Sequence, residues 1–480
     1  MTFPNRKTEP AGGVRLSGWW RWAAVLAPGL ILYFAPLPSL TPPQRHLLAV
    51  FISTVVALVA QPVPMAVSVL ISMTLLALTR TVPPGRVLSG FSDQNVWLIF
   101  TAFLFARAVT GTGFGLRVAY FFIRRFGRSA LTLGYSVAAS DLVLAPFIPS
   151  DTGRGGGIIY PITRSVAQAF NSEPGPTARR LGSYLIVVAF QVNCVVSAMF
   201  LTSMAANPLM AEFARKIAHV DLNWGRWAAG AALPGIVSLI LIPWVIYRLY
   251  PPEIRATEAA QQLAGEELRK LGPMSVRERW LAVIMAGVMA GWVSAPWHGV
   301  PNAFVALTAV CLILLTGVMQ WSDLLAETRA WDALMWFGPM LMMAGELTQS
   351  GVIGVLSGGV IGHLHGWSWG AIFMLLVPGY LYIHYTFASM TAQATALYQA
   401  FLGALVLGGC PPLVAALALG YFSSLNAGMT HYGTGAAPVF FGAGYVSQST
   451  WWKLGFVISL LNVAIWLGLG GLWWKVLGLW

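Results

Sequence analysis

The chain has 480 residues, of which 57% are hydrophobic and only 9% are charged, against about a quarter charged in ordinary soluble domains. A soluble fold of this length could not cover its surface with so few charges, so a soluble enzyme or a soluble binding module is excluded. The net charge of +12 does not indicate nucleic-acid binding, because the cations are scattered between apolar segments and form no basic face.

Apolar stretches close to membrane-spanning length follow one another along the chain. A helical crossing needs about 20 mainly apolar residues, and the abundant Gly and Pro are tolerated in transmembrane helices. The predicted fold is therefore an all-α polytopic membrane protein with about 11 transmembrane helices. The predicted spans are residues 19–37, 46–60, 63–79, 129–148, 181–204, 228–249, 279–296, 300–319, 367–388, 412–428 and 453–474.

Two further apolar stretches are interrupted near their middle by polar or flexible residues. Residues 95–125 are interrupted by Arg107 and by the run Gly111-Thr112-Gly113, and residues 332–362 are interrupted by Glu346 and by Ser350-Gly351. This pattern is typical of a re-entrant hairpin, whose tip must be buried in protein or face water because lipid cannot satisfy its backbone groups. Both stretches are followed by Ser-containing breaks at nearly equal offsets. We therefore predict two re-entrant hairpins in inverted repeats, a symmetry that points to a transporter binding site.

Arg107 and Glu346 each lie within one of these interrupted stretches. Ionisable residues inside a membrane are costly and are usually functional. The two side chains could pair with each other or cap the hairpin tips, and a direct substrate role is the less favoured interpretation.

The distribution of charged residues predicts the domain organisation and the orientation in the membrane. Arg6, Lys7 and Arg15 precede the first span, and a helix-prone, charged stretch joins the two halves. By the positive-inside rule the N-terminus and this linker are cytoplasmic, with the linker helix at the membrane surface. Four parts are expected: an N-terminal segment with the first helix (1–45), a first inverted repeat (46–250), the linker helix (251–279), and a second inverted repeat with a C-terminal helix (280–480).

The strongest candidate site is the run PFIPSDTGRGGGIIYP, residues 146–161. Prolines stop the preceding apolar segment, and Ser150, Asp151 and Thr152 then stand where N-cap residues are favoured. A helix N-terminus offers free N–H groups and partial positive charge to a carboxylate. Arg154 adds a full charge and a planar fork for bidentate pairing. The alternative, a polar loop outside the membrane, is disfavoured because an apolar segment leads straight into the run.

Three more breaks rich in small residues lie in apolar surroundings. They are TSMAANP (202–208), HYTFASMTAQ (384–393) and THYGTGAAP (430–438). His384 and His431 are intramembrane ionisable residues, which are either ligands or hydrogen-bonded core histidines. The candidate substrate-binding residues in these breaks are Asn207, Pro208, Ser389, Thr391, Gln393, His431, Thr434 and Pro438.

The three cysteines, Cys194, Cys311 and Cys410, are widely separated and lie in or beside apolar segments. They show neither metal-ligand spacing nor a disulfide framework, and we interpret them as buried small hydrophobes. The sequence shows no His, Glu, Asp or Cys constellation with catalytic or metal-binding spacing, so no enzyme, metal site or cofactor is predicted.

Taken together and in this order, the runs LAPFIPSDTGRGGGIIYPI, MFLTSMAANPL, HYTFASMTAQATALY and MTHYGTGAAPVFFGAGYV resemble the divalent anion:sodium symporter family. Within it the chain is most similar to the branch of bacterial citrate/succinate and tartrate/succinate antiporters and plastid 2-oxoglutarate/malate translocators. The resemblance covers about residues 51–480 and is specific for the family but not for the substrate. It implies a homodimer, a scaffold and a mobile transport domain in each protomer, and an elevator-like movement.

The resemblance also indicates whether transport is coupled to sodium. Sodium-coupled members carry Ser-Asn-Thr at both Ser-containing breaks, residues 150–152 and 389–391, where this chain has Asp151 and Met390 in place of the two Asn residues. This departure argues against sodium coupling. The exchanger branch often carries an Arg after the first motif, matched here by Arg154, and a His after the second, where this chain has Gln393. Asp151 is unexpected beside an anion site, and it could pair with Arg154 or bind a proton or cation.

The sequence therefore predicts a secondary carrier for small di- or tricarboxylate anions, of the 2-oxoglutarate, malate, succinate, citrate or tartrate class. Exchange in a bacterial inner membrane is the favoured mechanism, with the lipid bilayer and a second copy of the chain as partners. A sodium- or proton-coupled symporter is the alternative. A channel is disfavoured because paired broken segments favour alternating access over an open pore.

Overall fold

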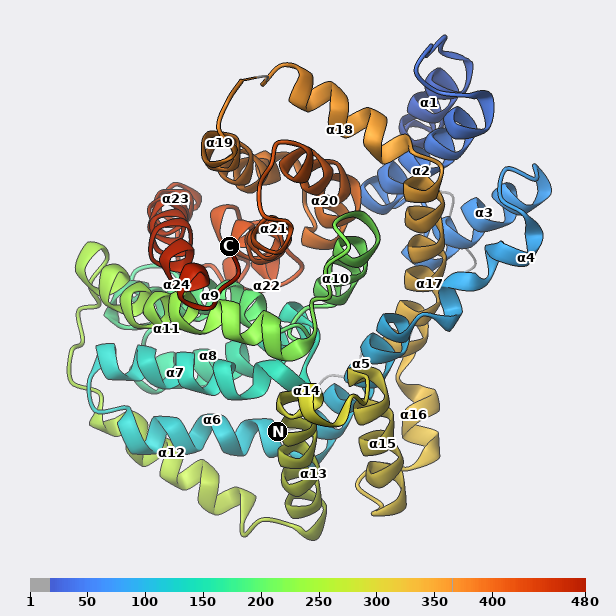
Figure 1. Cartoon of the computed structure of the whole chain (residues 1–480). Helices are drawn as coiled ribbons and strands as arrows, with labels where there is room; N and C mark the ends of the chain where they lie inside the picture. The colour runs from blue at the N-terminus through green and yellow to red at the C-terminus, as the bar shows by residue number, and fades with distance from the viewer. Residues whose placement is uncertain (1–17, 365) are drawn as a thin grey trace.

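The computed structural model of the chain describes residues 18–364 and 366–480, which form helices joined by short connections (Figure 1). Within this part of the chain, eight helices are long and apolar enough to cross a membrane. The all-α polytopic class is therefore supported, whereas the expected count of 11 crossing helices is not confirmed. The N-terminal cations Arg6, Lys7 and Arg15 lie outside the described residues. The eight spans are Pro42–Ala60, Gln94–Thr112, Ala130–Phe147, Gly182–Met199, Trp224–Leu249, Met390–Leu407, Pro412–Met429 and Gln448–Val476.

The helices form two packed groups, which lie on the two sides of Figure 1. The flanking group, on the right, consists of α2 (Pro42–Ala60), α3 (Met65–Leu78), α5 (Gln94–Thr112), α13 (Val276–Val293), α15 (Asn302–Leu315) and α17 (Thr328–Gln349). The central group consists of α7 (Ala130–Leu144), α8 (Tyr160–Ala169), α9 (Gly182–Met199), α10 (Ala206–Ile217), α11 (Trp224–Leu249) and α19 to α24, residues 369–476.

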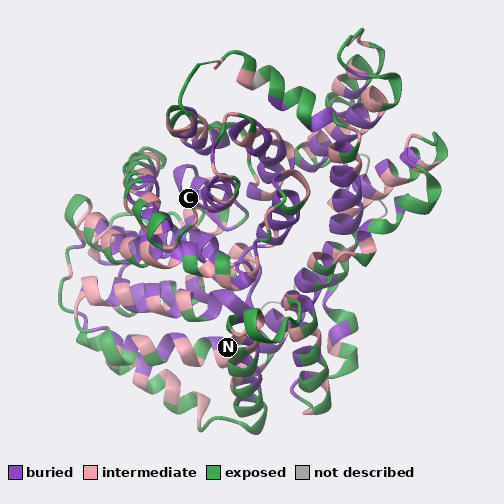
Figure 2. Cartoon of the chain, viewed as in Figure 1, coloured by how far each residue is buried: buried purple, intermediate pink, exposed green. Residues whose placement is uncertain are grey.

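The core of the central group is α9, in which every residue is buried. It packs against α7, α11 and α21 (Pro412–Leu425). Figure 2 shows buried residues concentrated where these helices meet, whereas the outward faces of α12 (Glu258–Leu271) and α18 (Val352–Gly362) are largely exposed. A helix that is apolar all round is expected to be enclosed by other helices, as α9 is.

The two interrupted stretches break at the expected glycines. Gly113 and Gly351 have φ angles of +80° and +83°, in the left-handed region where a residue without a Cβ is favoured. The limbs diverge after these turns, however, because α6 (Phe114–Phe126) packs along α7 and α12, while α18 packs on α20 (Met390–Leu407). The re-entrant interpretation of these two stretches is therefore not confirmed.

Hairpin-like returns of the chain occur one element later in each half. The first begins beside the linker, where the backbone N–H of Ala130 donates to the carbonyl of Arg255 at 2.9 Å. After α8 the chain returns to the same linker, where the N–H of Glu253 donates to the carbonyl of Arg179 at 3.0 Å. We call α7 and α8 the first hairpin, and its tip is the break at residues 145–151.

The second hairpin consists of α19 (Trp369–Tyr382) and α20, with its tip at residues 383–389. Its two outer ends lie together, since a Cβ on Gly408 would be 2.9 Å from Cδ1 of Ile372. The sequence analysis treated residues 367–388 as one full span and did not include α20 among the spans. The polar side chains of α20 reduce its apolar signal, and they include Thr391, Gln393, Thr395 and Gln399.

The linker between the halves contains α12, which lies along α6. Gln261 donates from Nε2 to the carbonyl of Arg124 at 2.8 Å. At the other end of α6, Arg117 pairs with Glu278 at 2.7 Å and joins α6 to the start of α13. The paired helices α6 and α12 thus connect the two groups along one side of the molecule.

Candidate functional site

The tip of the first hairpin is built by local sequence signals. Pro146 and Pro149 lack a backbone donor, so the α-helical ladder of α7 stops before them. Beyond them Ser150 accepts a hydrogen bond at its Oγ from the N–H of Gly153 at 2.9 Å. This cap begins a π-helical turn, η3 (Thr152–Ile159), that leads into α8. The predicted N-cap role of the Ser-Asp-Thr run is therefore supported for Ser150.

Arg154 is fully buried and forms an ion pair with Asp141 of α7 at 2.5 Å, with neither side chain exposed. Its Nη1 donates to the carbonyls of Ile148 and Ser203, both at 2.9 Å. Its Nη2 donates to Oγ of Ser197 at 2.8 Å. Arg154 therefore joins the first hairpin tip to α9 and to the break that follows α9.

The contribution of Arg154 to substrate binding remains a prediction, and its partner differs from the one considered from the sequence. Asp141, which sequence reasoning missed, neutralises the guanidinium and also accepts from Nδ2 of Asn193 at 3.0 Å. Asp151 does not pair with Arg154 but accepts a short hydrogen bond from Oγ1 of Thr434. An acidic residue within the apolar α7 was the available signal, because a buried charge needs a partner.

The fourth break, residues 430–438, lies directly against the first hairpin tip. Besides the contact between Thr434 and Asp151, a Cβ on Gly435 would lie 2.7 Å from Oγ1 of Thr152. Gly435 is exposed, and Asp151 and Thr152 are partly exposed, so this junction is accessible. Thr434 itself is buried, and Pro438 lies exposed in the first turn of α22 (Ala437–Phe441).

The second hairpin tip meets the same break through a buried hydrogen-bond network. His384 Nδ1 lies 2.5 Å from Oε1 of Gln393, and its Nε2 lies 2.8 Å from the carbonyl oxygen of Gly433. The amide of Gln393 is oriented by its Nε2, which donates to the carbonyl of Tyr380 at 2.6 Å, and by Asn426, which donates to its Oε1 at 2.7 Å.

Both ring nitrogens of His384 thus face oxygen atoms that accept hydrogen bonds. A histidine satisfies two acceptors only when both nitrogens carry a proton, which is the imidazolium form. The network therefore fixes the orientation of the ring, and a neutral ring can donate to only one of these two oxygens. Ser389 is the N-cap of α20 and accepts from the N–H of Ala392 at 3.3 Å, while Ser389 and Thr391 remain partly exposed.

The break at residues 202–208 lies behind the first tip. Thr202 donates from Oγ1 to the carbonyl of Pro146 at 2.6 Å. Asn207 donates from Nδ2 to the carbonyls of Ser197 and Phe200, both at 2.9 Å, and so satisfies the end of α9. Asn207 and Pro208 are buried at the start of α10. Side-chain oxygens of Asn207, Asn426 and Thr430 are buried without a protein hydrogen-bond partner.

Three predicted ionisable residues lie in other surroundings. His431 accepts a hydrogen bond from Nε1 of Trp452 at 3.0 Å and belongs to an aromatic cluster. Arg107 pairs with Asp323 at 3.5 Å, and Glu346 pairs with Arg86 at 3.3 Å. The pairing of Arg107 with Glu346 that the sequence suggested is therefore not formed.

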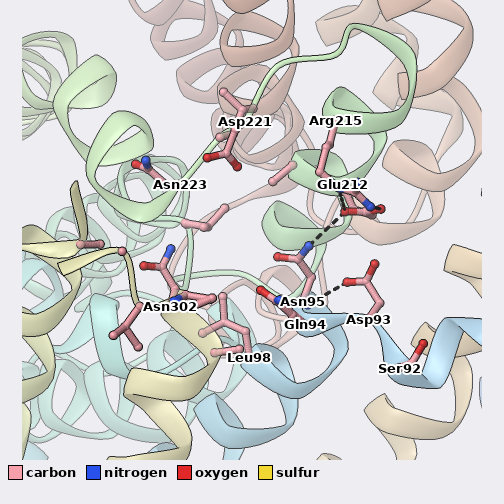
Figure 3. A pocket seen from close by; sticks show the side chains of 18 of the residues that line it. Ser92, Asp93, Gln94, Asn95, Leu98, Glu212, Arg215, Asp221, Asn223 and Asn302 are labelled. Atoms are coloured by element: carbon pink, nitrogen blue, oxygen red, sulfur yellow. Dashed lines mark hydrogen bonds and ion pairs between the residues drawn. The ribbon is translucent and has the colours of Figure 1, made fainter. Parts of the chain in front are cut away.

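A cleft of about 700 Å³ opens between the two helix groups. Figure 3 shows Asn95 from α5, Glu212 and Arg215 from α10, and Asn302 from α15 around it. Leu201, which directly precedes the break at residues 202–208, also contributes to its wall. Ser203, two residues after Leu201, accepts a hydrogen bond from Arg154 at its carbonyl. The cleft therefore reaches close to the buried pair of Arg154 and Asp141.

The match to a family model now decides the family. The model described as "Sodium:sulfate symporter transmembrane region" matches residues 16–480. The chain belongs to the divalent anion:sodium symporter family. It is therefore a transporter and not an enzyme, as the sequence analysis predicted.

Members of this family and more distant structures resemble the chain over most of its length. The putative malate transporter YflS of Bacillus subtilis is 44% identical over 457 residues, which cover 95% of this chain and 96% of the relative. The L-tartrate/succinate antiporter of Escherichia coli O157:H7 is 32% identical, with 95% and 98% covered. The crystal structure of the Alcanivorax borkumensis YdaH transporter shares the fold with a TM-score of 0.56 at 15% identity, covering 82% of this chain and 87% of that one.

Proposed function

We propose that this symporter-family chain carries small dicarboxylates or tricarboxylates, of the malate, succinate, tartrate, 2-oxoglutarate or citrate class, by exchanging one anion for another. The observation that carries the proposal is that both hairpin tips bond to the break at residues 430–438, at the neighbouring residues Gly433 and Thr434. Asp151 of the first tip bonds to Thr434, and His384 of the second tip bonds to Gly433.

This junction offers groups that suit a carboxylate. Ser150, Thr152, Ser389 and Thr391 are partly exposed, and each has a hydroxyl that can donate a hydrogen bond. The N-termini of η3 and α20 begin there, and a helix N-terminus favours an anion. The malate and tartrate/succinate specificities named for the relatives agree with this chemistry.

Exchange is favoured over sodium coupling because Asp151 and Met390 replace the two Asn residues of the sodium-coupled pattern, and because a basic side chain stands near each tip. Arg154 lies behind the first tip, although Asp141 balances its charge. His384 lies at the second tip, where its partners are neutral oxygens. A carrier in which His384 is protonated would return through the membrane more readily with an anion bound, because a buried unpaired charge is costly. Sodium- or proton-coupled symport is the alternative mechanism.

An elevator-type movement fits the division into two helix groups. The four breaks belong to the central group, and α6, α12 and α18 connect this group to the flanking one (Figure 1). In the proposed mechanism the central group carries the substrate past the flanking group, and the flanking group forms the dimer contact with a second copy. The protein would act in the bacterial inner membrane with its N-terminus in the cytoplasm.

The test is uptake of radiolabelled succinate by proteoliposomes that are empty or preloaded with malate, in sodium buffer and in choline buffer. Exchange predicts uptake only into preloaded vesicles and equal rates in the two buffers. Sodium-dependent uptake into empty vesicles would contradict exchange and favour the symporter. Lack of uptake under every condition, with a full panel of di- and tricarboxylates, would contradict the proposed substrate class.

A further inference from the structure

Arg329 is a cation near the first hairpin tip that belongs to the opposite helix group. It lies in the first turn of α17, which packs in the flanking group against α5 and α3. A Cβ placed on Gly153 would be 3.5 Å from Nη1 of Arg329 and 3.3 Å from Oγ of Ser150. The guanidinium therefore faces the tip across the boundary between the two groups.

The contacts of Arg329 leave one edge of its guanidinium available. Nε donates to Oε1 of Glu327 at 2.7 Å and Nη2 donates to Oε2 at 3.4 Å. No protein acceptor for Nη1 is found among the described residues, and this is the nitrogen that faces Gly153. Glu327 is almost fully enclosed, with 4% of its side chain exposed, whereas Arg329 is 54% exposed. The buried carboxylate thus holds an accessible guanidinium in a fixed orientation.

We propose that Arg329 binds a carboxylate of the substrate from the flanking group while the first hairpin tip holds the same anion through its hydroxyls. The inference rests on the proposed dicarboxylate transport and adds a residue to its site. Arg154 cannot perform this role in the present conformation, because its guanidinium is fully enclosed and all three of its nitrogens already donate to protein oxygens. Arg329 has an exposed nitrogen that is not used by its own carboxylate partner.

The position of Arg329 makes the contact specific to a conformation. If the central group moves relative to the flanking group, the tip leaves Arg329 behind, and the anion loses this partner. A ligand that gains a contact in only one of two conformations shifts the equilibrium toward that conformation. Arg329 would therefore favour the loaded carrier in the arrangement seen here.

The first experiment measures the KM for succinate in counter-exchange by the full-length protein in proteoliposomes. Removing one charge-assisted hydrogen bond is expected to raise KM about tenfold in Arg329→Gln. Arg329→Lys should recover part of the affinity, because it keeps the charge without the planar fork. The matched control is Arg107→Gln, which breaks a flanking-group ion pair of similar exposure, Arg107 with Asp323, and should keep KM near that of the wild type.

A second measurement does not depend on transport. In a Cys311→Ser background, which removes the exposed native thiol, Arg329→Cys should react with a charged methanethiosulfonate, and succinate should slow the reaction. Equal KM values for Arg329→Gln and Arg107→Gln, or labelling that succinate leaves unchanged, would overturn the inference. Failure of the wild-type protein to exchange succinate would instead refute the proposed function, so the two failures are distinguishable.

Discussion

The two hairpin tips belong to the two halves of the chain and hold charge in different ways. At the first tip Arg154 is paired with Asp141, which lies in the preceding limb α7. The corresponding limb of the second hairpin, α19, contains no acidic residue, and His384 bonds only to neutral oxygens. Both halves therefore contain a backbone break, while the charge that each tip offers to an anion is set by one or two side chains.

The two tips thus differ in how their basic residue is held. Arg154 is already paired with a carboxylate, whereas His384 bonds only to neutral oxygens. The pair of Arg154 and Asp141 has no net charge, and four hydrogen bonds fix the guanidinium. The ring of His384 has no carboxylate partner among its hydrogen bonds. Arg329 is paired with Glu327, but unlike Arg154 it is accessible and has a nitrogen that its carboxylate partner does not use.

The largest effect is expected from breaking the buried pair at the first tip. Asp141→Ala leaves Arg154 as an unpaired buried charge, which should destabilise the protein by about 3–5 kcal/mol. Replacing both residues, as Asp141→Leu with Arg154→Met, should restore much of the stability because apolar side chains of similar volume can replace a buried pair. Thermal unfolding in detergent measures both changes.

Transport by the stable double variant then tests the role of Arg154. Near-normal succinate affinity would show that Arg154 only supports the fold at the tip. Loss of transport by a well-folded double variant would restore a direct substrate role for Arg154. A single Asp141→Ala variant as stable as the wild type would contradict the buried pair itself.

A smaller effect is expected from crowding the first tip. A Cβ on Gly155 would lie 2.9 Å from Cγ of Asn193, the residue that bonds to Asp141. Gly155→Ala should therefore cost about 1–3 kcal/mol through overpacking. Gly157→Ala is the matched control in the same glycine run, because its Cβ would meet nothing within 4 Å. The two variants should differ in melting temperature, and equal values would contradict the packing described here.

The second tip should affect binding more than stability. His384→Gln removes the titratable ring while keeping a side chain that can donate to the carbonyl of Gly433. We expect the KM for succinate to rise about tenfold, equivalent to about 1.4 kcal/mol, with little change in melting temperature. An unchanged KM would show that His384 is a neutral core histidine and that the two tips do not differ in charge toward the substrate.

The positions of the breaks could be predicted from the sequence better than the side chains that contact the break residues. Proline and glycine act on the local backbone, so the breaks at Gly113, Gly351 and residues 146–161 could be located from the sequence alone. The re-entrant shape predicted for the stretches around Gly113 and Gly351 was not confirmed, and it could not be fixed from the sequence because the direction of a chain after a glycine turn depends on what the next helix packs against. The limb α20 was missed because its amides and hydroxyls face the protein interior instead of lipid.

The partners of the site residues depend on tertiary contacts that local signals do not contain. Asp141 reaches Arg154 across the first hairpin, and the contact between Thr434 and Asp151 joins residues from opposite halves of the chain. The sequence pattern assigned no role to Arg329. Its proximity to Gly153 arises because α17 packs beside the central group, which no motif near Arg329 indicates.

The central proposal is that this family member exchanges dicarboxylates at the junction of the two tips. The most direct test is succinate uptake into proteoliposomes with and without internal malate, measured in sodium and in choline. Exchange predicts rapid uptake only into malate-loaded vesicles, at the same rate in both buffers. Uptake into empty vesicles that requires sodium would contradict it.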